Sequence, residues 1–416
     1  MKKRLLLVTE GFPFGESERS FLSEEVRHLA EAFDLSVLAL DNGEELKYPV
    51  AGLQRVERYH FPAFRRSLGF GMLPELLHPS VWSEVAACCR KNGFGTMAAS
   101  AKEIIYFRYK AWVAKKKIRE LVKSEQIDLV YTYWCTAPTL AAVDLKQEFP
   151  QLKVITRFHG MDLYEERSSI NWQPFRRHIA AGADGLCFAC SYGLTYFAKR
   201  WGKECGDKLH LYYLGSRDYG MADTPKTEPL RLLSCSNLIP LKRVERIIEG
   251  IALLPEDMKL HWDMVGDGPE REKLEALAQE KFRDRPNMTW KFHGAIPNAQ
   301  LAAHYHTLAP QLFITASSTE GGAPVSIQEV FSMGIPAIGT EVGGIPDLIC
   351  DGQTGFLMPQ DAIPSDVAAA ICRFTALNDV QYGQMRRAAR QHWERNFNAV
   401  CNAERFTNDL LDLVSK

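Results

Sequence analysis

The chain of 416 residues lacks any apolar run long enough to cross a membrane. A spanning helix needs about 20 apolar residues and a signal-peptide core about 7–15, whereas the apolar run near the start stops at Glu10. An excess of charge of one sign is also absent, because 50 Lys and Arg residues balance 51 Asp and Glu residues. This balance creates no overall field that would recruit nucleic acid. We therefore expect a cytoplasmic protein without a nucleic-acid partner.

Clusters of metal-binding residues are missing as well. The ten cysteines are scattered, and the single CxxC pair, Cys187 and Cys190, has no second pair or histidine cluster near it in the sequence. A structural zinc site needs four such ligands, and scattered thiols are typical of a reducing compartment. We expect reduced thiols and no metal site.

Two nucleotide-binding motifs are also absent. No Gly-x-Gly-x-x-Gly follows the strand-like run that ends at Val8, which argues against a dinucleotide-binding first domain. The P-loop sequence, with its paired Gly-Lys and Ser or Thr, occurs nowhere, and this excludes a P-loop NTPase.

The chain does contain two successive series of α/β units. Strand-like runs occupy residues 4–8, 35–40, 128–133, 154–156, 186–189 and 209–213 in the first series, and 230–235, 260–265, 288–292 and 312–315 in the second. Residues 337–338 and 355–357 follow in the second series. Helical segments separate these runs, and the chain is too long for one compact core. The pattern predicts an α/β protein of two Rossmann-like domains that face each other across a cleft.

The domain boundaries follow from a stretch with little apolar periodicity. Residues 214–229 carry glycine and proline and are typical of a linker. We assign residues 1–215 to the first domain, 216–229 to the linker and 230–395 to the second domain.

Residues 61–117 interrupt the α/β rhythm with basic and aromatic side chains. The basic residues include Arg65, Arg66, Lys115, Lys116 and Lys117. One interpretation is peripheral contact with an anionic membrane surface, on the inner face of the membrane. The other is a helical excursion with a solvated charged face.

The most informative stretch places glycines between two acids. The run at 312–315 leads to Glu320 and two glycines, and an apolar helix leaves the stretch beyond Glu329. Backbone N–H groups at a helix start bind anions, and α/β proteins bind ligands at the carboxyl ends of parallel strands. The alternative interpretation is a capped helix after a buried strand.

A nucleoside diphosphate derivative is the ligand that best fits these groups. Lys242 and Arg243 can neutralise phosphates, and a carboxylate near a helix terminus can accept the two hydroxyls of a ribose. No Asp-x-Asp pair occurs that would hold a divalent metal against a diphosphate. Charge neutralisation would then fall to the two cations and to backbone dipoles. In the first half, His159 and Asp162 follow a predicted strand, where a lone histidine is either a ligand contact or structural.

The sequence resembles the retaining GT-B glycosyltransferases, specifically glycosyltransferase family 4, over nearly its whole length. The motifs that carry the resemblance are Glu320-Gly321-Gly322 through Glu329, Ser332-Met333-Gly334-Ile335-Pro336, Gly343-Gly344, Asp351-Gly352-x-Thr354-Gly355-Phe356-Leu357, Leu238-x-Pro240-x-Lys242-Arg243 and Val265-Gly266-Asp267-Gly268-Pro269. Phe12-Pro13-Phe14-Gly15-Glu16 and Phe158-His159-Gly160-x-Asp162 are similar to loops of bacterial members.

The resemblance implies a role for each matching residue. Glu329 would hold the ribose hydroxyls, Glu320 would lie against the transferred sugar, and Lys242 would lie beside the diphosphate. His159 would touch the donor sugar. The other candidates are the amides of Gly322, Ala323, Val325 and Ser326 for the sugar and diphosphate, Arg243 and Asn237 near the diphosphate, and Gly15, Glu16 and Asp162 in first-domain loops. The last helix, residues 396–416, would return to the first domain.

The implied activity is metal-independent, retaining transfer of a hexose from a UDP- or GDP-sugar to a hydroxyl acceptor. The acceptor would be a glycan or a lipid-linked sugar in bacterial polysaccharide or glycolipid assembly. No cofactor is expected, because the nucleotide sugar is the substrate.

Two departures from the family pattern leave an alternative open. Eight residues separate Glu320 from Glu329 where seven are usual, and Asn237 stands where the family has a diphosphate-binding arginine. The alternative is a catalytically silent subunit that binds a nucleotide sugar or partners another transferase.

Overall fold

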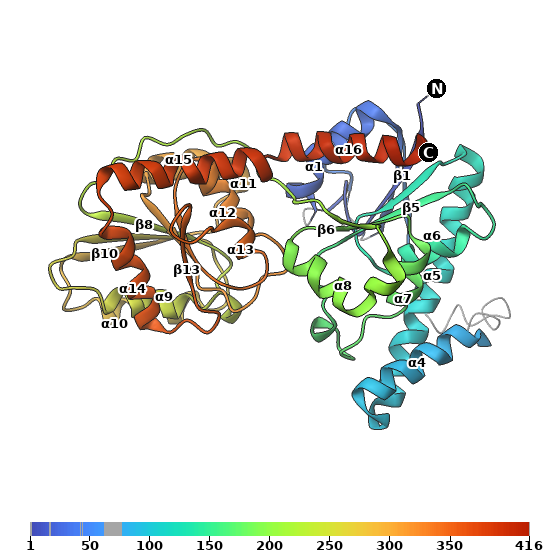
Figure 1. The fold of residues 1–416 in the computed structure, drawn as a ribbon, viewed down its shortest axis with the longest axis horizontal. Coiled ribbons are helices and arrows are strands. Elements are labelled where there is room, and N and C mark those ends of the chain that lie inside the picture. Colours follow the sequence, from blue (N-terminus) through green and yellow to red (C-terminus); the bar gives the residue numbers. More distant parts are fainter. Residues whose placement is uncertain (1, 16–17, 42, 44, 62–76, 416) are drawn as a thin grey trace. The chain divides into compact units, whose positions relative to one another are not determined.

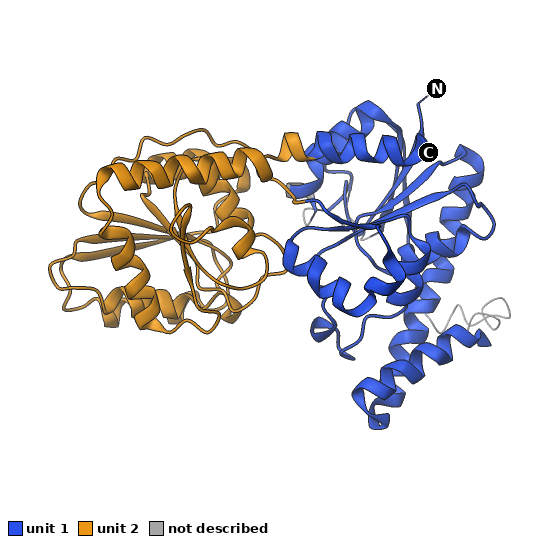
Figure 2. Cartoon of the chain, viewed as in Figure 1, with its two compact units in different colours: residues 1–212, 403–416 blue, residues 213–402 orange. Residues whose placement is uncertain are grey.

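The computed structural model describes residues 2–15, 18–41, 43, 45–61 and 77–415. The chain divides into two compact units, drawn in two colours in Figure 2. Unit 1 contains Met1–Tyr212 and Ala403–Lys416, and unit 2 contains Tyr213–Asn402. In each unit, helices cover both faces of one parallel sheet (Figure 1).

Unit 1 is built on a seven-stranded sheet of order β3-β2-β1-β4-β5-β6-β7. Its elements are β1 (Arg4–Thr9), α1 (Arg19–Ala32), β2 (Asp34–Leu40), β3 (Leu53–Tyr59), α4 (Pro79–Asn92), η1 (Phe94–Thr96), α5 (Met97–Glu125), β4 (Leu129–Thr132), α6 (Ala137–Leu145), β5 (Lys153–Phe158), η2 (Glu165–Arg167), α7 (Arg176–Gly182), β6 (Gly185–Phe188), α8 (Ser191–Cys205) and β7 (Leu209–Leu211).

Unit 2 is built on a six-stranded sheet of order β10-β9-β8-β11-β12-β13. Its elements are β8 (Leu230–Cys235), η3 (Pro240–Lys242), α9 (Val244–Ala252), β9 (Leu260–Val265), α10 (Arg271–Lys281), β10 (Met288–Gly294), α11 (Asn298–Leu308), β11 (Leu312–Ile314), α12 (Val325–Ser332), β12 (Ala337–Thr340), α13 (Ile345–Leu348), β13 (Gly355–Met358), α14 (Pro364–Thr375) and α15 (Asp379–Asn396). The last helix of the chain is α16 (Ala399–Ser415).

All ten predicted strand runs are confirmed as strands of these two sheets, and β12 and β13 contain the residues that follow them in the second series. The sequence analysis missed β3, whose residues Leu-Gln-Arg-Val-Glu-Arg-Tyr are mostly exposed or half-buried. Because β3 lies at the edge of its sheet, only part of its length needs apolar side chains. The interrupting region proves to be helical where it is described, as α4, η1 and the long α5. Within the described ranges, no helix has the length and apolar character that a membrane crossing requires.

The division between the units falls inside α16. From Ala403 onward this helix belongs to unit 1, where Phe406 and Leu410 are buried in one of its two cores. The Phe406 ring covers the guanidinium of Arg157 at 4.6 Å, and Arg157 forms a buried ion pair of 2.6 Å with Glu25. The first division point falls between Tyr212 and Tyr213.

Each sheet has one point where the strand order reverses direction. In unit 1 this switch point lies between β1 and β4, and in unit 2 it lies between β8 and β11. Connections leave the two strands at a switch point in opposite directions, so their carboxyl ends form a crevice that commonly binds ligands. The candidate residues must therefore be sought at these two places.

Candidate functional site

At the switch point of unit 2, two loops are fastened to each other. Ser318, after β11, donates from its amide and its hydroxyl to the carbonyl of Leu241, at 2.9 and 3.1 Å. These two hydrogen bonds hold the loop after β8 beside the loop after β11. As a result, the Lys242 Nζ lies 2.5 Å from the Glu320 Oε1. The structure thus joins two of the predicted residues, 78 positions apart in sequence, in one ion pair.

Two glycines support the backbone of the acidic stretch from behind. Gly343 has φ +52°, and a Cβ there would lie 2.2 Å from the carbonyl oxygen of Glu320. A Cβ at Gly344 would lie 2.5 Å from the backbone of Gly322 and Ala323. Only glycine allows the loop after β12 to pack this closely. Residues 321–324 lead from Glu320 to the start of α12 at Val325, and Glu320 reaches Lys242.

The start of α12 supplies backbone donors. No side chain caps this helix, and Gln328 donates to the carbonyl of Pro324 at 3.3 Å to close its first turn. The amides of Val325 and Ser326 therefore precede the first intrahelical bond. Gly322, Ala323, Val325 and Ser326 are all half-buried, so an anion can approach them.

Glu329 lies deeper and has a different neighbour. It is 4% exposed, and its Oε1 accepts a hydrogen bond of 2.9 Å from the hydroxyl of Tyr219. Burial raises the pKa of the Glu329 carboxyl to about 7, although the bond from Tyr219 acts in the opposite direction. The sequence analysis missed Tyr219, because it lies in the segment assigned as a linker and belongs to no periodic pattern. The backbone amide of Tyr219 donates a hydrogen bond of 3.1 Å to the Ser332 Oγ, which holds Tyr219 next to α12.

Asn237 and Arg243 do not join the ion pair. Asn237 is exposed, and its carbonyl accepts from the amide of Ile239 at 3.0 Å. Arg243 has φ +47°, and its Nη1 donates to the carbonyl of Gln360 at 3.1 Å. Among the residues that the structure describes, Lys242 is the only cation paired with Glu320.

In unit 1, His159 is neutral and oriented by a backbone carbonyl. Its Nε2 lies 3.0 Å from the carbonyl oxygen of Tyr133, which can only accept, so Nε2 carries the hydrogen. Burial, together with the nearby charge of Arg157, lowers the pKa of His159 to about 3. The ring packs against that of Trp134, with centroids 4.2 Å apart. His159 can therefore accept a hydrogen bond at Nδ1 but does not act as an acid.

Asp162 and Gly15 hold loops in place. Asp162 is 4% exposed and accepts from the amides of His159 and Cys135, both at 2.8 Å. The amide of Gly15 donates to the carbonyl of Gly11 at 2.8 Å and closes a tight turn. Glu16, Arg65 and Arg66 lie outside the described residues.

Glu18, which the sequence analysis did not select, occupies the loop after β1. It is 1% exposed, and its two carboxylate oxygens accept four hydrogen bonds. Three come from the backbone amides of Glu10, Gly11 and Phe12, at 3.2, 2.8 and 2.7 Å, and one from the Trp134 indole at 2.5 Å. These amides occupy the place where Rossmann domains commonly bind phosphate. In unit 1 an internal carboxylate satisfies them.

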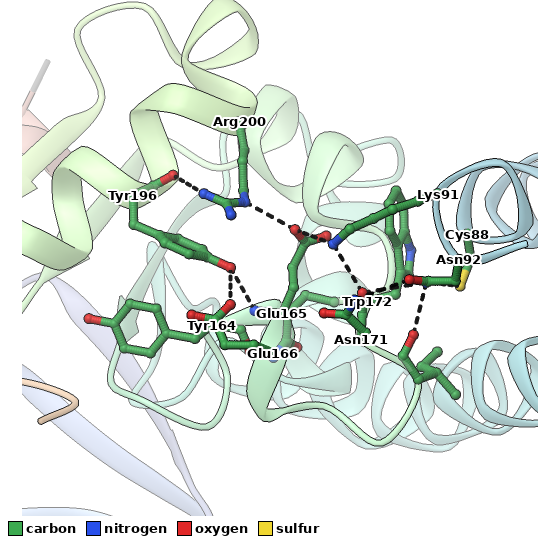
Figure 3. Close-up of polar contacts among 12 residues, drawn as sticks. Cys88, Lys91, Asn92, Tyr164, Glu165, Glu166, Asn171, Trp172, Tyr196 and Arg200 are labelled. Atoms are coloured by element: carbon green, nitrogen blue, oxygen red, sulfur yellow. Dashed lines mark hydrogen bonds and ion pairs between the residues drawn. The ribbon is translucent and has the colours of Figure 1, made fainter. Parts of the chain in front are cut away.

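A cavity of about 520 Å³ opens at the same switch point of unit 1. It is lined by Glu10, Leu40, Phe61, Tyr106, Phe107, Lys110, Trp134, Cys135, Thr136, Ala137, Pro138, Met161, Asp162, Gln173 and Arg176. Polar contacts between α4, the loop after β5 and α8 are drawn in Figure 3: Glu165 accepts from Lys91 at the end of α4 at 2.8 Å and from Arg200 of α8 at 3.0 Å. Asn92 donates to the carbonyl of Ile170 at 3.0 Å. These contacts fix α4 against the loop that supplies Met161, Asp162 and Gln173.

The three lysines predicted to contact a membrane have partners within the protein. Lys115 pairs with Glu148 at 3.8 Å, and Lys117 pairs with Glu57 at 2.6 Å. The Lys116 ammonium lies 3.4 Å from the centroid of the Trp112 ring. Membrane contact through these residues stays a prediction.

Comparison with known proteins agrees with this architecture. Residues 229–376 match the family model described as Glycosyl transferases group 1. The chain is 25% identical over 256 residues to N-acetyl-alpha-D-glucosaminyl L-malate synthase of Bacillus anthracis, which covers 58% of this chain and 64% of that protein. It is 28% identical over 179 residues to a GDP-mannose-dependent alpha-mannosyltransferase of Mycolicibacterium smegmatis, covering 42% of this chain and 43% of that one. The chain thus spans less than two thirds of the length of either relative.

Two solved structures are similar over nearly the whole chain. One is the lipopolysaccharide outer core galactosyltransferase WaaB in its apo form, with a TM-score of 0.70 at 14% identity, covering 98% of this chain and 99% of that one. The other is the Anabaena protein HepE in complex with UDP and glucose, with a TM-score of 0.64 at 15% identity and the same coverage. The fold is therefore GT-B, with two Rossmann-like units. Residues 229–376 are thus similar to the glycosyl transferases group 1, in agreement with the family 4 motifs of the sequence.

Proposed function

We propose that the protein is a retaining glycosyltransferase that moves a hexose from a UDP- or GDP-sugar to a hydroxyl acceptor in polysaccharide or glycolipid assembly. The observation that carries this proposal is the ion pair of 2.5 Å between Lys242 and Glu320 at the switch point of unit 2. A lysine suits a diphosphate, a carboxylate suits sugar hydroxyls, and the amides that open α12 suit phosphate oxygens. All three kinds of group lie on adjoining segments of one sheet edge.

The residues would divide the work as follows. Glu329 would accept the ribose hydroxyls, while Glu320 and the neutral His159 would position the sugar. The acceptor hydroxyl would attack the anomeric carbon from the face that the diphosphate leaves. Its proton would pass to the leaving phosphate oxygen, and Lys242 with the α12 amides would stabilise the growing charge there. This route retains the anomeric configuration and needs neither a metal nor a cofactor.

The relatives support a nucleotide-sugar donor but not one base. The HepE structure holds UDP and glucose, whereas the mycobacterial relative is named for GDP-mannose. The WaaB name refers to a lipopolysaccharide acceptor, which motivates a glycan or glycolipid acceptor here.

The first experiment is a thermal-shift panel of UDP, GDP, ADP and their hexose derivatives, followed by nucleotide-release assays with each donor. We expect one nucleotide to raise the unfolding midpoint by mass action and its sugar to be turned over slowly, with water as acceptor. In the Lys242→Ala variant, the nucleotide should no longer raise the unfolding midpoint. The matched control Lys259→Ala should keep it, because Lys259 is 63% exposed and pairs only with the exposed Glu228.

The same panel separates the rival functions. Nucleotide binding without hydrolysis or transfer to any acceptor would favour the catalytically silent subunit, for which Asn237 is the motivating residue. If no nucleotide or nucleotide sugar shifts the midpoint, the transferase and the nucleotide-sugar-binding subunit are both wrong, and the partner subunit of another transferase is favoured.

A further inference from the structure

Three carboxylates gather at the switch point of unit 1, and in two of them both oxygens accept hydrogen bonds from the protein. Glu18 accepts four hydrogen bonds and Asp162 accepts one on each oxygen. Glu10 accepts only one, on Oε1, from the hydroxyl of Thr136 at 3.0 Å. Within the described part of the chain, nothing donates to the Glu10 Oε2. Of the three acids, Glu10 is therefore the one with an oxygen that has no donor among the described residues.

The surroundings of Glu10 disfavour its charged form. Glu10 is half-buried, and this burial raises the pKa of its carboxyl, with the charge of Glu18 acting in the same direction. A carboxylate that loses hydration is stabilised by hydrogen bonds to its charged form. A hydroxyl donor from a ligand would supply such a bond to the Glu10 Oε2.

Glu10 also stands at a fixed place in the cavity. Its own amide is one of the four groups bound by Glu18, and the Trp134 indole bound by the same carboxylate lines the cavity. Glu18 is thus a positioning residue for Glu10 and Trp134, which both line the cavity.

The cavity lining is divided by the strand order. On the side of β2, β3 and α5, the lining residues are Leu40, Phe61, Tyr106, Phe107 and Lys110, of which only the last is charged. The Lys110 ammonium lies over the rings of Tyr106 and Phe61, at 4.6 and 5.5 Å. On the side of β4 and β5 lie the polar groups of Thr136, Asp162, Gln173 and Arg176. The apolar residues Trp134, Cys135, Ala137, Pro138 and Met161 also line this second side. Since β1 lies between β2 and β4, Glu10 lies between a largely apolar side and a side that carries most of the polar groups.

We propose that this cavity binds an amphipathic acceptor, whose polyol head donates a hydroxyl to Glu10 and whose apolar chain lies along Phe61, Tyr106 and Phe107. The assignment rests on the proposed function, and it names the acceptor class that the earlier observations left open. Glu10 orients the hydroxyl as a hydrogen-bond acceptor, and the proton still leaves with the donor phosphate.

The test measures binding in the absence of any donor. The probes are the n-octyl glycosides of glucose, galactose and mannose below their critical micelle concentrations. Methyl glycosides provide heads without a chain, and octyl tetraethylene glycol provides a chain without a sugar head. Affinities come from calorimetry or saturation-transfer NMR on the full chain. We expect at least one octyl glycoside to bind about tenfold more tightly than both its methyl counterpart and octyl tetraethylene glycol.

Substitutions then assign the two ends of the ligand. Glu10→Gln keeps the size but removes the charge, and it should weaken octyl glycoside binding about tenfold while leaving octyl tetraethylene glycol unaffected. Tyr106→Ala should remove most of the advantage of the octyl chain. The controls are Glu120→Gln and Phe94→Ala, whose side chains are exposed on the same unit and do not line the cavity. Circular dichroism melting curves would show that each variant folds.

Unchanged binding in Glu10→Gln would overturn the proposal, as would octyl glycosides that bind no better than octyl tetraethylene glycol. These outcomes are distinct from failure of the proposed function. A protein that binds octyl glycosides through Glu10 but no nucleotide would fail only the donor assignment. Transfer to acceptors at an unchanged KM in Glu10→Gln would fail only the acceptor assignment.

Discussion

Both units place acidic side chains at the switch point of a parallel sheet, but those acids have different partners. In unit 1 the carboxylate of Glu18 is enclosed by three amides and an indole from its own unit. In unit 2 no side chain caps α12, and Glu320 pairs with the half-buried Lys242. An internal carboxylate fills the anion-binding position in one unit, while the other unit leaves its amides and a lysine for a ligand.

The largest effect should come from removing the charge that unit 2 offers. Lys242→Ala and Glu320→Ala should each lower kcat about 10²–10³-fold, because groups that stabilise or orient the reacting atoms contribute roughly that much. The measurement is turnover of the donor selected by the thermal-shift panel. Turnover at the wild-type rate in both variants would contradict the assigned roles.

The next effect concerns the stability of unit 1. Glu18→Gln should lower the free energy of unfolding by about 2 kcal/mol, because glutamine offers one acceptor oxygen to a site with four donors. The melting midpoint should fall by about 5 °C. Glu31→Gln is the control, since Glu31 is 62% exposed and should change the midpoint by less than about 1 °C. A Glu18→Gln midpoint within the error of wild type would show that the four bonds add nothing to stability.

The third prediction uses the raised pKa of Glu329. A pKa of about 7 means that the carboxyl is largely protonated at pH 6 and largely ionised at pH 8. If the ionised form binds the ribose hydroxyls, affinity for the nucleotide sugar should rise about tenfold from pH 6 to pH 8. UDP-glucose and GDP-mannose are suitable probes, because neither diphosphate diester titrates in this range. Glu329→Gln should bind more weakly and without this pH dependence.

The same group affects stability in the opposite direction. The folded protein holds the Glu329 proton more tightly than the unfolded chain, whose pKa is near 4.5. Its contribution to stability therefore falls as pH rises from about 4.5 to 7 and is constant above that range. A Glu329→Gln variant should lose this component of the pH profile, and a profile identical to wild type would contradict the raised pKa.

The smallest effect is a change in UDP affinity when the Lys242–Glu320 ion pair is broken from either side. Because Glu320 neutralises Lys242 in the ligand-free protein, Glu320→Ala should bind UDP about threefold to tenfold more tightly while its kcat falls. Lys242→Ala should weaken UDP binding. Calorimetry with UDP and GDP measures both changes, and weaker binding in both variants would show that the pair does not compete with the diphosphate.

Local sequence patterns were sufficient for the fold. The runs at 4–8 and 230–235 are apolar because parallel strands are buried on both faces, and such runs are visible without any tertiary information. The residues of the glycine-rich stretch could be selected because helix starts, glycines and paired acids occur close together in the chain. β3 escaped detection because an edge strand needs fewer apolar residues, and Tyr219 because it occurs in a segment without periodicity.

The sequence by itself therefore determined two parallel-sheet units, the positions of Lys242 and Glu320 in segments that follow strands, and that of Glu329 in the helix after Glu320. Only the tertiary structure decided which carboxylates are available to a ligand. Glu10, Glu18 and Asp162 are the same kind of group at the same switch point, and they differ only in how many amides and hydroxyls fold around them. Those donors come from segments more than a hundred residues apart in some cases, such as Trp134 beside Glu18. Hydrogen-bond satisfaction depends on this long-range packing, and no local pattern records it.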